Sequence, residues 1–140
     1  MKKVAVVFWS GTGNTAAMAD AVAKGAQAAG ADVTKFEASG FGAGDVDKFD
    51  AIAFGCPAMG SEQLEDSEFE PMFESIKASL AGKNIALFGS YGWGDGEWMR
   101  NWEDDCRAAG ANLVCESVTA NDAPDDAAVE ACKALGAALA

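Results

Sequence analysis

The chain has 140 residues, of which half are hydrophobic and 23% are charged, a composition typical of a globular protein and unlike that of a disordered one. Its 22 acidic and 10 basic residues give a formal net charge of −12, which argues against nucleic acid or anionic lipid as partners and favours a basic protein partner or simple solubility. Histidine is absent and the four cysteines form no C-x-x-C pair, which excludes Ser-His and Cys-His catalytic pairs and most zinc sites.

Hydropathy and the N-terminus bear on the location of the protein. No apolar run approaches the roughly 20 residues that a membrane-spanning helix needs. The basic start, Met1 to Lys3, leads into strand-like residues without a small-residue cleavage site, so we expect no signal peptide. These features predict a cytoplasmic protein with no membrane partner, and no shift of composition divides residues 1–140 into more than one domain.

The first predicted elements are a strand and a helix, joined by a polar and glycine-rich turn. Residues 3–9 form a β-rich apolar run typical of a strand that is buried on both faces. Residues 14–29 have the apolar periodicity of a helix. The alternation over 31–37 predicts an edge strand, and the glycine-rich segment 38–47 predicts a loop with one short helical turn.

The second half repeats this alternation of strands and helices. Short apolar runs predict buried strands over 51–55 and 84–90, and a last strand over 111–118. A helix is expected after the loop that follows each of these three strands.

Sequence signals mark the starts of these helices. Ser67-x-x-Glu70 resembles a capping box before an amphipathic run, and residues 97–109 form the next helix. The final helix is predicted over roughly 124–139, with Asp122 as its candidate N-cap.

Strands that alternate with helices predict a parallel sheet covered on both faces and joined by right-handed crossovers. Ligands of such sheets bind beyond the carboxyl ends of the strands, at the topological switch point. Three glycine-bearing loops leave strand ends in this chain, over 10–15, 56–62 and 90–97. We therefore expect these loops to meet at one edge of the sheet and to form a binding site.

The first loop has the features of a phosphate site. Backbone N–H groups at a helix start lack intrahelical partners, and the helix dipole places partial positive charge there. Gly11 and Gly13 allow close approach of the backbone, and further donors are available from side chains: Ser10, Thr12, Asn14 and Thr15. Neither a P-loop nor G-x-G-x-x-G is present, so the pattern favours a monophosphate held without Lys or Arg over an ordinary strand-to-helix turn.

The other two loops offer polar contacts and an aromatic surface. Trp93 lies between Gly92 and Gly94, which leaves both indole faces open for stacking; the alternative is a ring folded back on the protein. Gly60 can adopt positive φ, so that its carbonyl could point into or out of the site, and Glu62 could accept a hydrogen bond from a ring imide. The remaining carboxylates of this acidic run are interpreted as a solvated face: Glu65, Asp66, Glu68 and Glu70. A phosphate site, an aromatic platform and polar edge contacts together indicate a mononucleotide with a flat ring.

At these residues the chain resembles, over its full length, the flavodoxins, small cytoplasmic electron carriers that bind FMN. Residues 10–15 match the family's phosphate loop, 89–94 match its second isoalloxazine loop, and 56–62 are similar to the first flavin loop of short-chain flavodoxins from anaerobic bacteria. The resemblance implies a flavodoxin-like three-layer α/β/α sandwich with a five-stranded parallel sheet of order 2-1-3-4-5. The absence of a long insertion in the last strand also places the chain in the short-chain group.

The resemblance further implies a low-potential one-electron carrier with non-covalently bound FMN, which shuttles between semiquinone and hydroquinone. The uncompensated phosphate and the acidic protein would keep the second couple strongly reducing. An FMN-dependent quinone reductase on the same fold stays open as an alternative. Partners are expected to be redox proteins with basic docking surfaces, met transiently by a monomer through the rim around the cofactor.

Individual roles are carried over from the family to matching positions. Trp93 is expected to stack on one face of the flavin and Met59 to cover the other, with Glu62 near N3 and the Gly60 carbonyl turning toward N5–H after the first electron. Trp9 precedes the phosphate loop and is expected near the ring or the phosphate, and the helical spacing of Trp98 favours a core position. The complete set of predicted FMN contacts, with no catalytic residue and no metal ligand, is Trp9, Ser10, Gly11, Thr12, Gly13, Asn14, Thr15, Pro57, Ala58, Met59, Gly60, Ser61, Glu62, Ser90, Tyr91, Gly92, Trp93, Gly94, Asp95 and Trp98.

Overall fold

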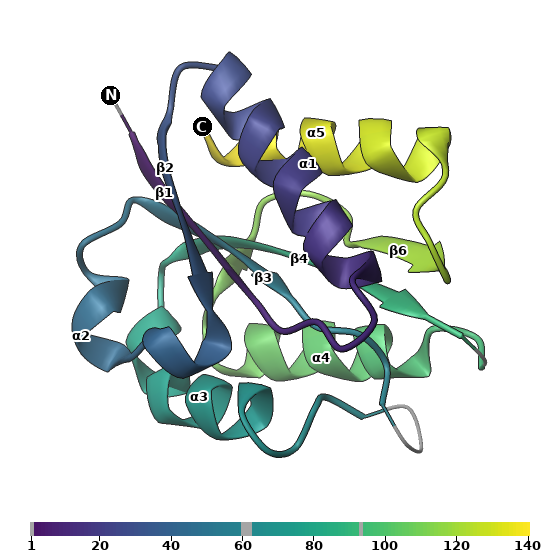
Figure 1. Ribbon diagram of the computed structural model, residues 1–140. Coiled ribbons are helices and arrows are strands. Elements are labelled where there is room, and N and C mark those ends of the chain that lie inside the picture. Colours follow the sequence, from purple (N-terminus) through teal and green to yellow (C-terminus); the bar gives the residue numbers. More distant parts are fainter. Residues whose placement is uncertain (1, 60–62, 93) are drawn as a thin grey trace.

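A parallel β-sheet runs through the centre of the molecule, and helices cover both of its faces (Figure 1). The structure is a computed structural model that describes residues 2–59, 63–92 and 94–140. The strand order β2-β1-β3-β4-β5 confirms the predicted three-layer fold, and a further strand, β6, also pairs with β4. The strands are β1 (Lys3–Phe8), β2 (Asp32–Glu37), β3 (Ala51–Gly55), β4 (Asn84–Tyr91), β5 (Asn112–Leu113) and β6 (Val118–Asn121).

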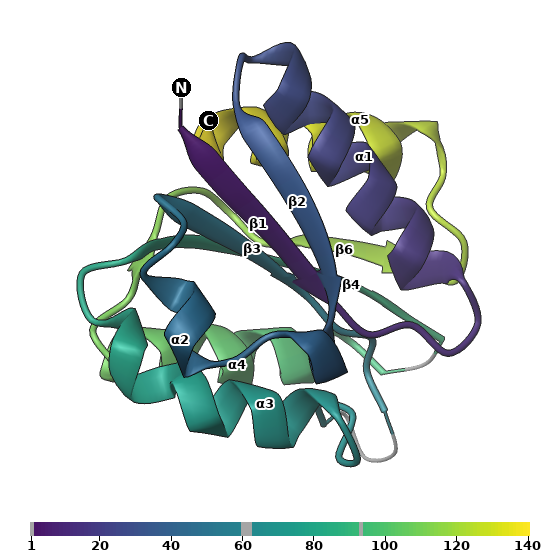
Figure 2. The same cartoon turned by 60° about the vertical axis from the view of Figure 1, so that its left-hand side comes forward.

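The helices form one layer on each side of the sheet, as Figure 2 shows from a second direction. α1 and α5 cover one face, and α2, α3 and α4 cover the other (Figures 1 and 2). Within the described part of the chain, no helix is both long and apolar enough to cross a membrane. The helices are α1 (Asn14–Ala28), α2 (Ala43–Val46), α3 (Phe69–Ile76), α4 (Glu97–Ala108) and α5 (Asp126–Leu139), with 3-10 turns η1 (Ala38–Gly40) and η2 (Lys77–Leu80).

The central strands divide their side chains between two cores, as the twofold period of a strand requires. The core on the side of α3 and α4 receives large residues from β3 and β4, among them Ile52, Phe54 and Leu87. The core on the side of α1 and α5 receives the alternate positions, which include Ala53 and Ala86. Phe88 of β4 also faces this core, and the small side chains of the alanines in α1 allow that helix to lie close to the sheet.

α1 and α5 pack against each other with their backbones in contact. A Cβ atom on Gly25 would lie 2.0 Å from the carbonyl oxygen of Lys133, and one on Gly136 would lie 2.0 Å from that of Val22. Any side chain at either glycine would push the helices apart, so packing requires both. This contact holds α1, whose N-terminus follows the first predicted loop, in place on the sheet.

The prediction of one last strand over 111–118 is wrong, because the chain leaves the sheet edge in the middle of that run. β5 pairs with the start of β4, at Asn84 and Ile85, whereas β6 pairs with its end, from Phe88 to Tyr91. In between, the Ser117 hydroxyl donates to Glu103 Oε2 in α4 at 2.7 Å. The chain thus bulges toward α4 and returns as β6, which carries it to the carboxyl edge of the sheet.

Two predicted helix caps are also wrong. The residue before α3, Glu68, makes no side-chain cap; the N–H groups of Glu68 and of Phe69, the first residue of α3, are instead bound by the carboxylate of Glu65, which lies further upstream. At α5 the N-cap is Asp125, whose Oδ1 accepts a hydrogen bond from the Ala128 N–H at 2.8 Å. Asp122, the predicted cap, lies outside the helix with a left-handed φ of 58°.

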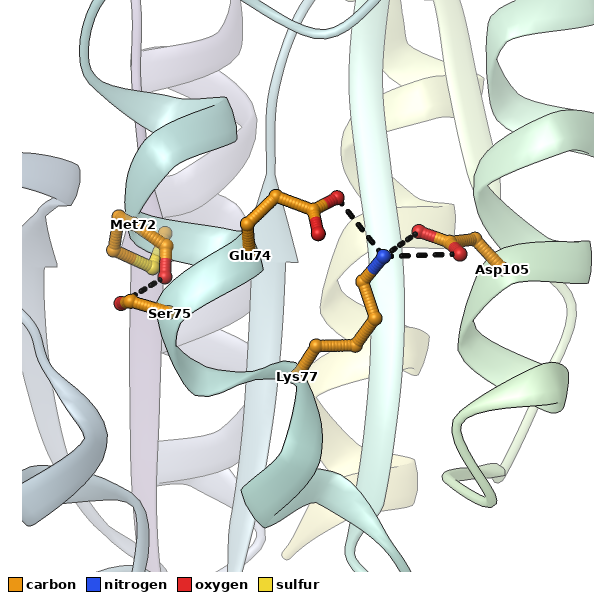
Figure 3. A network of polar contacts seen from close by, with 5 residues as sticks. All are labelled: Met72, Glu74, Ser75, Lys77 and Asp105. Atoms are coloured by element: carbon orange, nitrogen blue, oxygen red, sulfur yellow. Dashed lines mark hydrogen bonds and ion pairs between the residues drawn. The ribbon is translucent and has the colours of Figure 1, made fainter.

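A lysine joins the end of α3 to α4 (Figure 3). Lys77 Nζ lies 2.9 Å from Glu74 Oε1, within the same turn, and 2.9 Å from Asp105 Oδ2 in α4. Its hydrogen bonds to Glu74 and Asp105 raise the pKa of Lys77 above the ordinary lysine value, against the opposing effect of partial burial. The two helices that flank the second and third predicted loops are therefore held together by an ion-pair network.

Candidate functional site

Segments that follow the carboxyl ends of four strands surround a pocket of about 220 Å³. β1, β3, β4 and β6 each contribute the residues directly after or at their ends. The structure thus brings together the described parts of the three predicted loops at one edge of the sheet. The lining residues are Trp9, Gly11, Thr12, Asn14, Pro57, Ala58, Met59, Ser90, Tyr91, Gly92 and Asp122.

The first loop wraps around the N-terminus of α1. The Ser10 hydroxyl oxygen accepts hydrogen bonds from the backbone N–H groups of Gly13, at 3.1 Å, and Ala16, at 3.2 Å. Gly13 has a φ of 95°, a conformation that side chains other than hydrogen disfavour. The N-terminus of a helix favours the binding of a phosphate, and none of the described residues that line the pocket is a lysine or arginine.

Thr15 does not line the pocket but ties the first loop to the third. It is buried, with 1% of its surface exposed, and its Oγ1 lies 3.0 Å from the Oγ of Ser90 at the end of β4. The Ser90 N–H also points to Thr15 Oγ1, at 3.4 Å. Of this hydroxyl pair, only Ser90 reaches the pocket.

Trp9 forms a wall between the pocket and a neighbouring hollow of about 230 Å³. Its indole Nε1–H donates to Glu68 Oε2 at 2.9 Å, and its backbone N–H donates to the Gly55 carbonyl at 3.0 Å. A Cβ atom on Gly11 would lie 3.0 Å from the six-membered ring of Trp9, so a side chain there would displace the indole. Trp9 thus lines the pocket, while its predicted contact with the ring or the phosphate stays a prediction. Its link to Glu68 is a contact that sequence patterns do not indicate.

The second loop supplies an apolar floor. The Ala58 N–H donates to the Ser90 carbonyl at 3.0 Å, and Met59 and Gln63 exchange two backbone hydrogen bonds of 2.8 and 2.9 Å. Met59 is 38% exposed and is the one large hydrophobic residue classed as exposed in the described part of the chain. Such a side chain in a pocket suits a flat apolar ligand. Gly60, Ser61 and Glu62 lie outside the described residues, so their roles stay predictions.

The third loop meets Asp122, a residue that sequence reasoning assigned to a helix cap. The Asp122 N–H donates to the Tyr91 carbonyl at 2.7 Å, and a Cβ on Gly92 would lie 3.5 Å from the Asp122 carboxylate. Asp122 follows β6 directly, and this position after a fourth strand end is the signal that could have placed it in the site. Trp93, the predicted stacking residue, lies outside the described residues.

Among the described residues, five other predicted contacts lie outside the pocket lining: Ser10 and Gly13, which line the neighbouring hollow, and Gly94, Asp95 and Trp98. Trp98 is 2% exposed and supports the site from the core, where its Nε1–H donates to the Cys56 carbonyl at 3.2 Å. This placement agrees with the core position that its helical spacing favours. Asp95 forms an ion pair with Arg100 at 3.1 Å, and neither it nor Gly94 is among the residues that line the pocket.

A buried carboxylate lies behind the second loop, where the sequence predicted a solvated face. Glu65 is 4% exposed, and its backbone N–H donates to the Cys56 sulfur at 3.4 Å. Burial alone would raise the pKa of Glu65, but hydrogen bonds to its carboxylate outweigh that effect and lower the pKa below the ordinary glutamate value. The donors are the Ser67 hydroxyl and the backbone N–H groups of Ser67, Glu68 and Phe69.

Cys56 is a neutral thiol at this position. Burial raises its pKa to about 12, and its Sγ–H donates to the Pro57 carbonyl at 3.5 Å. It is therefore a hydrogen-bonding element of the loop and not a reactive thiolate.

The arrangement can bind a flat-ring mononucleotide. Gly11, Thr12 and Asn14, around the start of α1, line one part of the pocket, and Met59, Trp9 and Tyr91 are among the residues that line the rest. These residues fit FMN, since one end of that ligand is a phosphate and the other a flat apolar ring.

Comparisons with known proteins identify close relatives. A family model described as Flavodoxin matches residues 6–136. A flavodoxin of Megasphaera elsdenii is 47% identical over 137 residues, which cover 98% of each chain, and one of Clostridium beijerinckii is 44% identical over 122 residues, which cover 87% of this chain and 88% of the relative. The solution structure of two-electron reduced Megasphaera elsdenii flavodoxin superposes with a TM-score of 0.90 over 97% of both chains, at 47% identity.

Proposed function

Because the chain belongs to the flavodoxin family, and is thus an FMN-binding electron carrier and not an enzyme, we propose that the pocket at the carboxyl edge of its sheet holds the FMN. The observation that carries this proposal is the lining of one pocket by the described parts of all three predicted flavin and phosphate loops. The two relatives also support the assignment of this protein to the short-chain flavodoxins.

The phosphate of FMN belongs, in this proposal, at the N-terminus of α1. The side chains of Thr12 and Asn14, which line the pocket, would bind the phosphate. The Gly13 and Ala16 amides, which line the neighbouring hollow and donate to the Ser10 hydroxyl, hold the first loop in place beside it. The flavin ring would lie against Met59, whose exposed side chain gains apolar contact when covered.

FMN supplies the one-electron chemistry when it is bound, and the residues of the chain orient it and set the charge around it. Asp122 lines the pocket and Glu68 lies behind Trp9, so carboxylates are near the site while no cation lines its described part. Adding negative charge to a ligand in such surroundings is unfavourable. We therefore expect a low reduction potential for the second electron, which suits a donor of electrons to other redox proteins.

The proposed partners are redox proteins with basic docking surfaces, which the net charge of −12 supports. We propose that the protein acts as a monomer, since carriers of this kind exchange partners through small transient contacts. The cytoplasm is the proposed location, and the four cysteines support it because all of them are free thiols and three are buried.

The position of the phosphate can be tested with two ligands. Thr12→Ala removes a hydroxyl from the proposed phosphate end, and Thr119→Ala is the matched control, because Thr119 is exposed on β6 and does not line the pocket. FMN and riboflavin, which lacks the phosphate, are titrated into the apoprotein and followed by flavin fluorescence. The proposal expects Thr12→Ala to weaken FMN binding about tenfold to a hundredfold, the effect of one hydrogen bond to a charged group, and to leave riboflavin binding unchanged. An equal loss for both ligands, or no loss for FMN, would contradict it.

A further inference from the structure

The Glu65 carboxylate is the centre of a hydrogen-bond network that sets the end of the second loop. It accepts four hydrogen bonds from the three residues 67–69, with 2.7 Å from Ser67 N–H and 2.8 Å each from the N–H groups of Glu68 and Phe69. The main chain of Glu65 is held as well, because its N–H donates to Cys56 Sγ. Residue 56, at the start of the second loop, is therefore tied to residue 65, which lies beyond its end.

The same network reaches Trp9, the residue before the first loop, through one intermediate residue. Glu65 fixes the backbone N–H of Glu68, and the Glu68 side chain in turn accepts the indole N–H of Trp9 at 2.9 Å. Trp9 lies 59 positions earlier in the chain and forms one wall of the pocket. Glu68 is the residue before α3, with φ −129° and ψ −47°. Its carbonyl accepts the first helical hydrogen bond of α3, from Met72 N–H at 3.2 Å, and Glu65 holds its N–H, so its position depends on both contacts.

We propose that Glu65 is a positioning residue for the FMN site, which orients the Trp9 indole through Glu68 and anchors the second loop at its end. The inference rests on the proposed function, because it takes the pocket beside Trp9 as the FMN site. Glu65 itself does not line the pocket. Its effect on the ligand is therefore geometric, and it differs from the effect that a charge near the site would have.

Charge and geometry are separated by two substitutions at this position. Glu65→Gln removes the charge and replaces one acceptor oxygen by a donor, whereas Glu65→Asp keeps the charge but shortens the side chain, so that it no longer reaches the amides of Glu68 and Phe69 together. Asp66→Asn is the matched control for loss of charge, because Asp66 is the exposed neighbour and its side chain makes no hydrogen bond or ion pair with the described residues.

A third substitution tests the path to Trp9. Glu68→Ala removes the carboxylate that accepts the Trp9 indole N–H, but the backbone N–H of residue 68 can still donate to the Glu65 carboxylate. If Glu65 acts through Glu68, the double variant Glu65→Gln/Glu68→Ala binds FMN no more weakly than the more affected single variant. Independent effects would instead add.

Two measurements report the result. One is the FMN dissociation constant of each apoprotein; the other is the Trp9 indole N–H resonance in the NMR spectrum of the apoprotein, assigned by its loss in Trp9→Phe. We expect Glu65→Gln and Glu65→Asp both to raise the dissociation constant about tenfold, which equals about 1.4 kcal/mol, and to move the Trp9 resonance. Asp66→Asn should change the constant by less than about twofold, since isolated exposed charges contribute little.

Several results would overturn the inference. They are an effect of Glu65→Gln equal to that of Asp66→Asn, wild-type behaviour of Glu65→Asp, an unmoved Trp9 resonance, or additive effects in the double variant. If Glu65→Gln does not fold, Glu65→Asp and Glu68→Ala decide between the same outcomes. Should Trp9→Phe leave FMN binding unchanged while Thr12→Ala still discriminates FMN from riboflavin, this inference fails and the FMN site stands. If Trp9→Phe leaves FMN binding unchanged and Thr12→Ala does not discriminate FMN from riboflavin, the proposed FMN site itself is wrong.

Discussion

Loss of the Glu65 carboxylate should destabilise the apoprotein as well as its site. In Glu65→Gln, a neutral amide faces the hydroxyl and backbone donors of residues 67–69, and one of its two polar atoms is a donor that repels them. The N–H groups of Ser67 and Glu68 belong to exposed residues and can turn to water, whereas Phe69 is fully buried. The loss of these charge-assisted hydrogen bonds, which also cap α3, should lower the free energy of unfolding by about 2 kcal/mol. For a chain of this size, that lowers the melting temperature by about 6 °C.

The pH dependence of this effect has a definite sign. The hydrogen bonds to Glu65 lower its pKa in the folded protein below the value in the unfolded chain. The stabilisation is therefore complete above the ordinary glutamate pKa of about 4.3 and is lost as the pH falls through the lower folded-state value. The stability difference between the wild type and Glu65→Gln should be constant near neutral pH and should shrink only in acid.

Urea unfolding of the apoproteins at pH 7 and at a series of acidic pH values measures both effects. Asp66→Asn serves again as the control, because it removes a neighbouring charge that caps no helix. The reasoning is refuted if Glu65→Gln is as stable as Asp66→Asn at pH 7. It is also refuted if the deficit of Glu65→Gln below the folded-state pKa of Glu65 is as large as the deficit at pH 7.

Three further predictions concern other parts of the fold. Lys77→Met removes both ion pairs of Figure 3 and should lower the unfolding free energy by about 1 kcal/mol at neutral pH. Because the folded protein raises the pKa of Lys77, this loss should fade only as the pH rises above the raised pKa. An unchanged urea midpoint at pH 7 would contradict the prediction. Trp98→Phe leaves the buried Cys56 carbonyl without its indole donor and should cost about 3 kcal/mol in urea unfolding, so a loss below about 1 kcal/mol would show that this bond is dispensable. Gly60→Ala disfavours a positive φ at residue 60 by about 1–2 kcal/mol. On the family resemblance, it should lower the potential for addition of the first electron to FMN by about 40–90 mV. An unchanged first potential in a redox titration would exclude a flip of the carbonyl at residue 60.

Features that depend on local pattern could be predicted from the sequence. The buried strand over 51–55 has the same bounds in the structure, because a short apolar run between turn residues has few other ways to be buried. The start of α1 at residue 14 follows from the glycine-rich loop before it. The meeting of the three loops at one edge then follows from the parallel topology, since all of them leave carboxyl ends of strands.

Features that depend on distant partners could not be predicted in this way. Glu65 lies in a run of carboxylates that look alike in sequence, and only the fold of residues 65–69 gives it four donors while its neighbour Asp66 stays exposed. The split of the last strand depends on where Ser117 meets Glu103 in α4. The left-handed conformation of Asp122 depends on its bond to the Tyr91 carbonyl, which belongs to a neighbouring strand.

Two side-chain hydrogen bonds connect the region of the first loop to the rest of the site, Thr15–Ser90 and Trp9–Glu68, and they differ in how firmly their partners are held. Thr15 and Ser90 are buried and lie between α1 and the end of β4, two elements that are fixed by the packing of the sheet and of α5. Trp9 instead binds Glu68, an exposed residue whose N–H is held by Glu65 and whose carbonyl accepts from Met72 N–H in α3. The second loop also contacts the buried link, since the Ala58 N–H donates to the Ser90 carbonyl. A displacement of Glu65 would therefore act first on the Trp9 indole, through the exposed Glu68, whereas the Thr15–Ser90 pair is held by two packed elements.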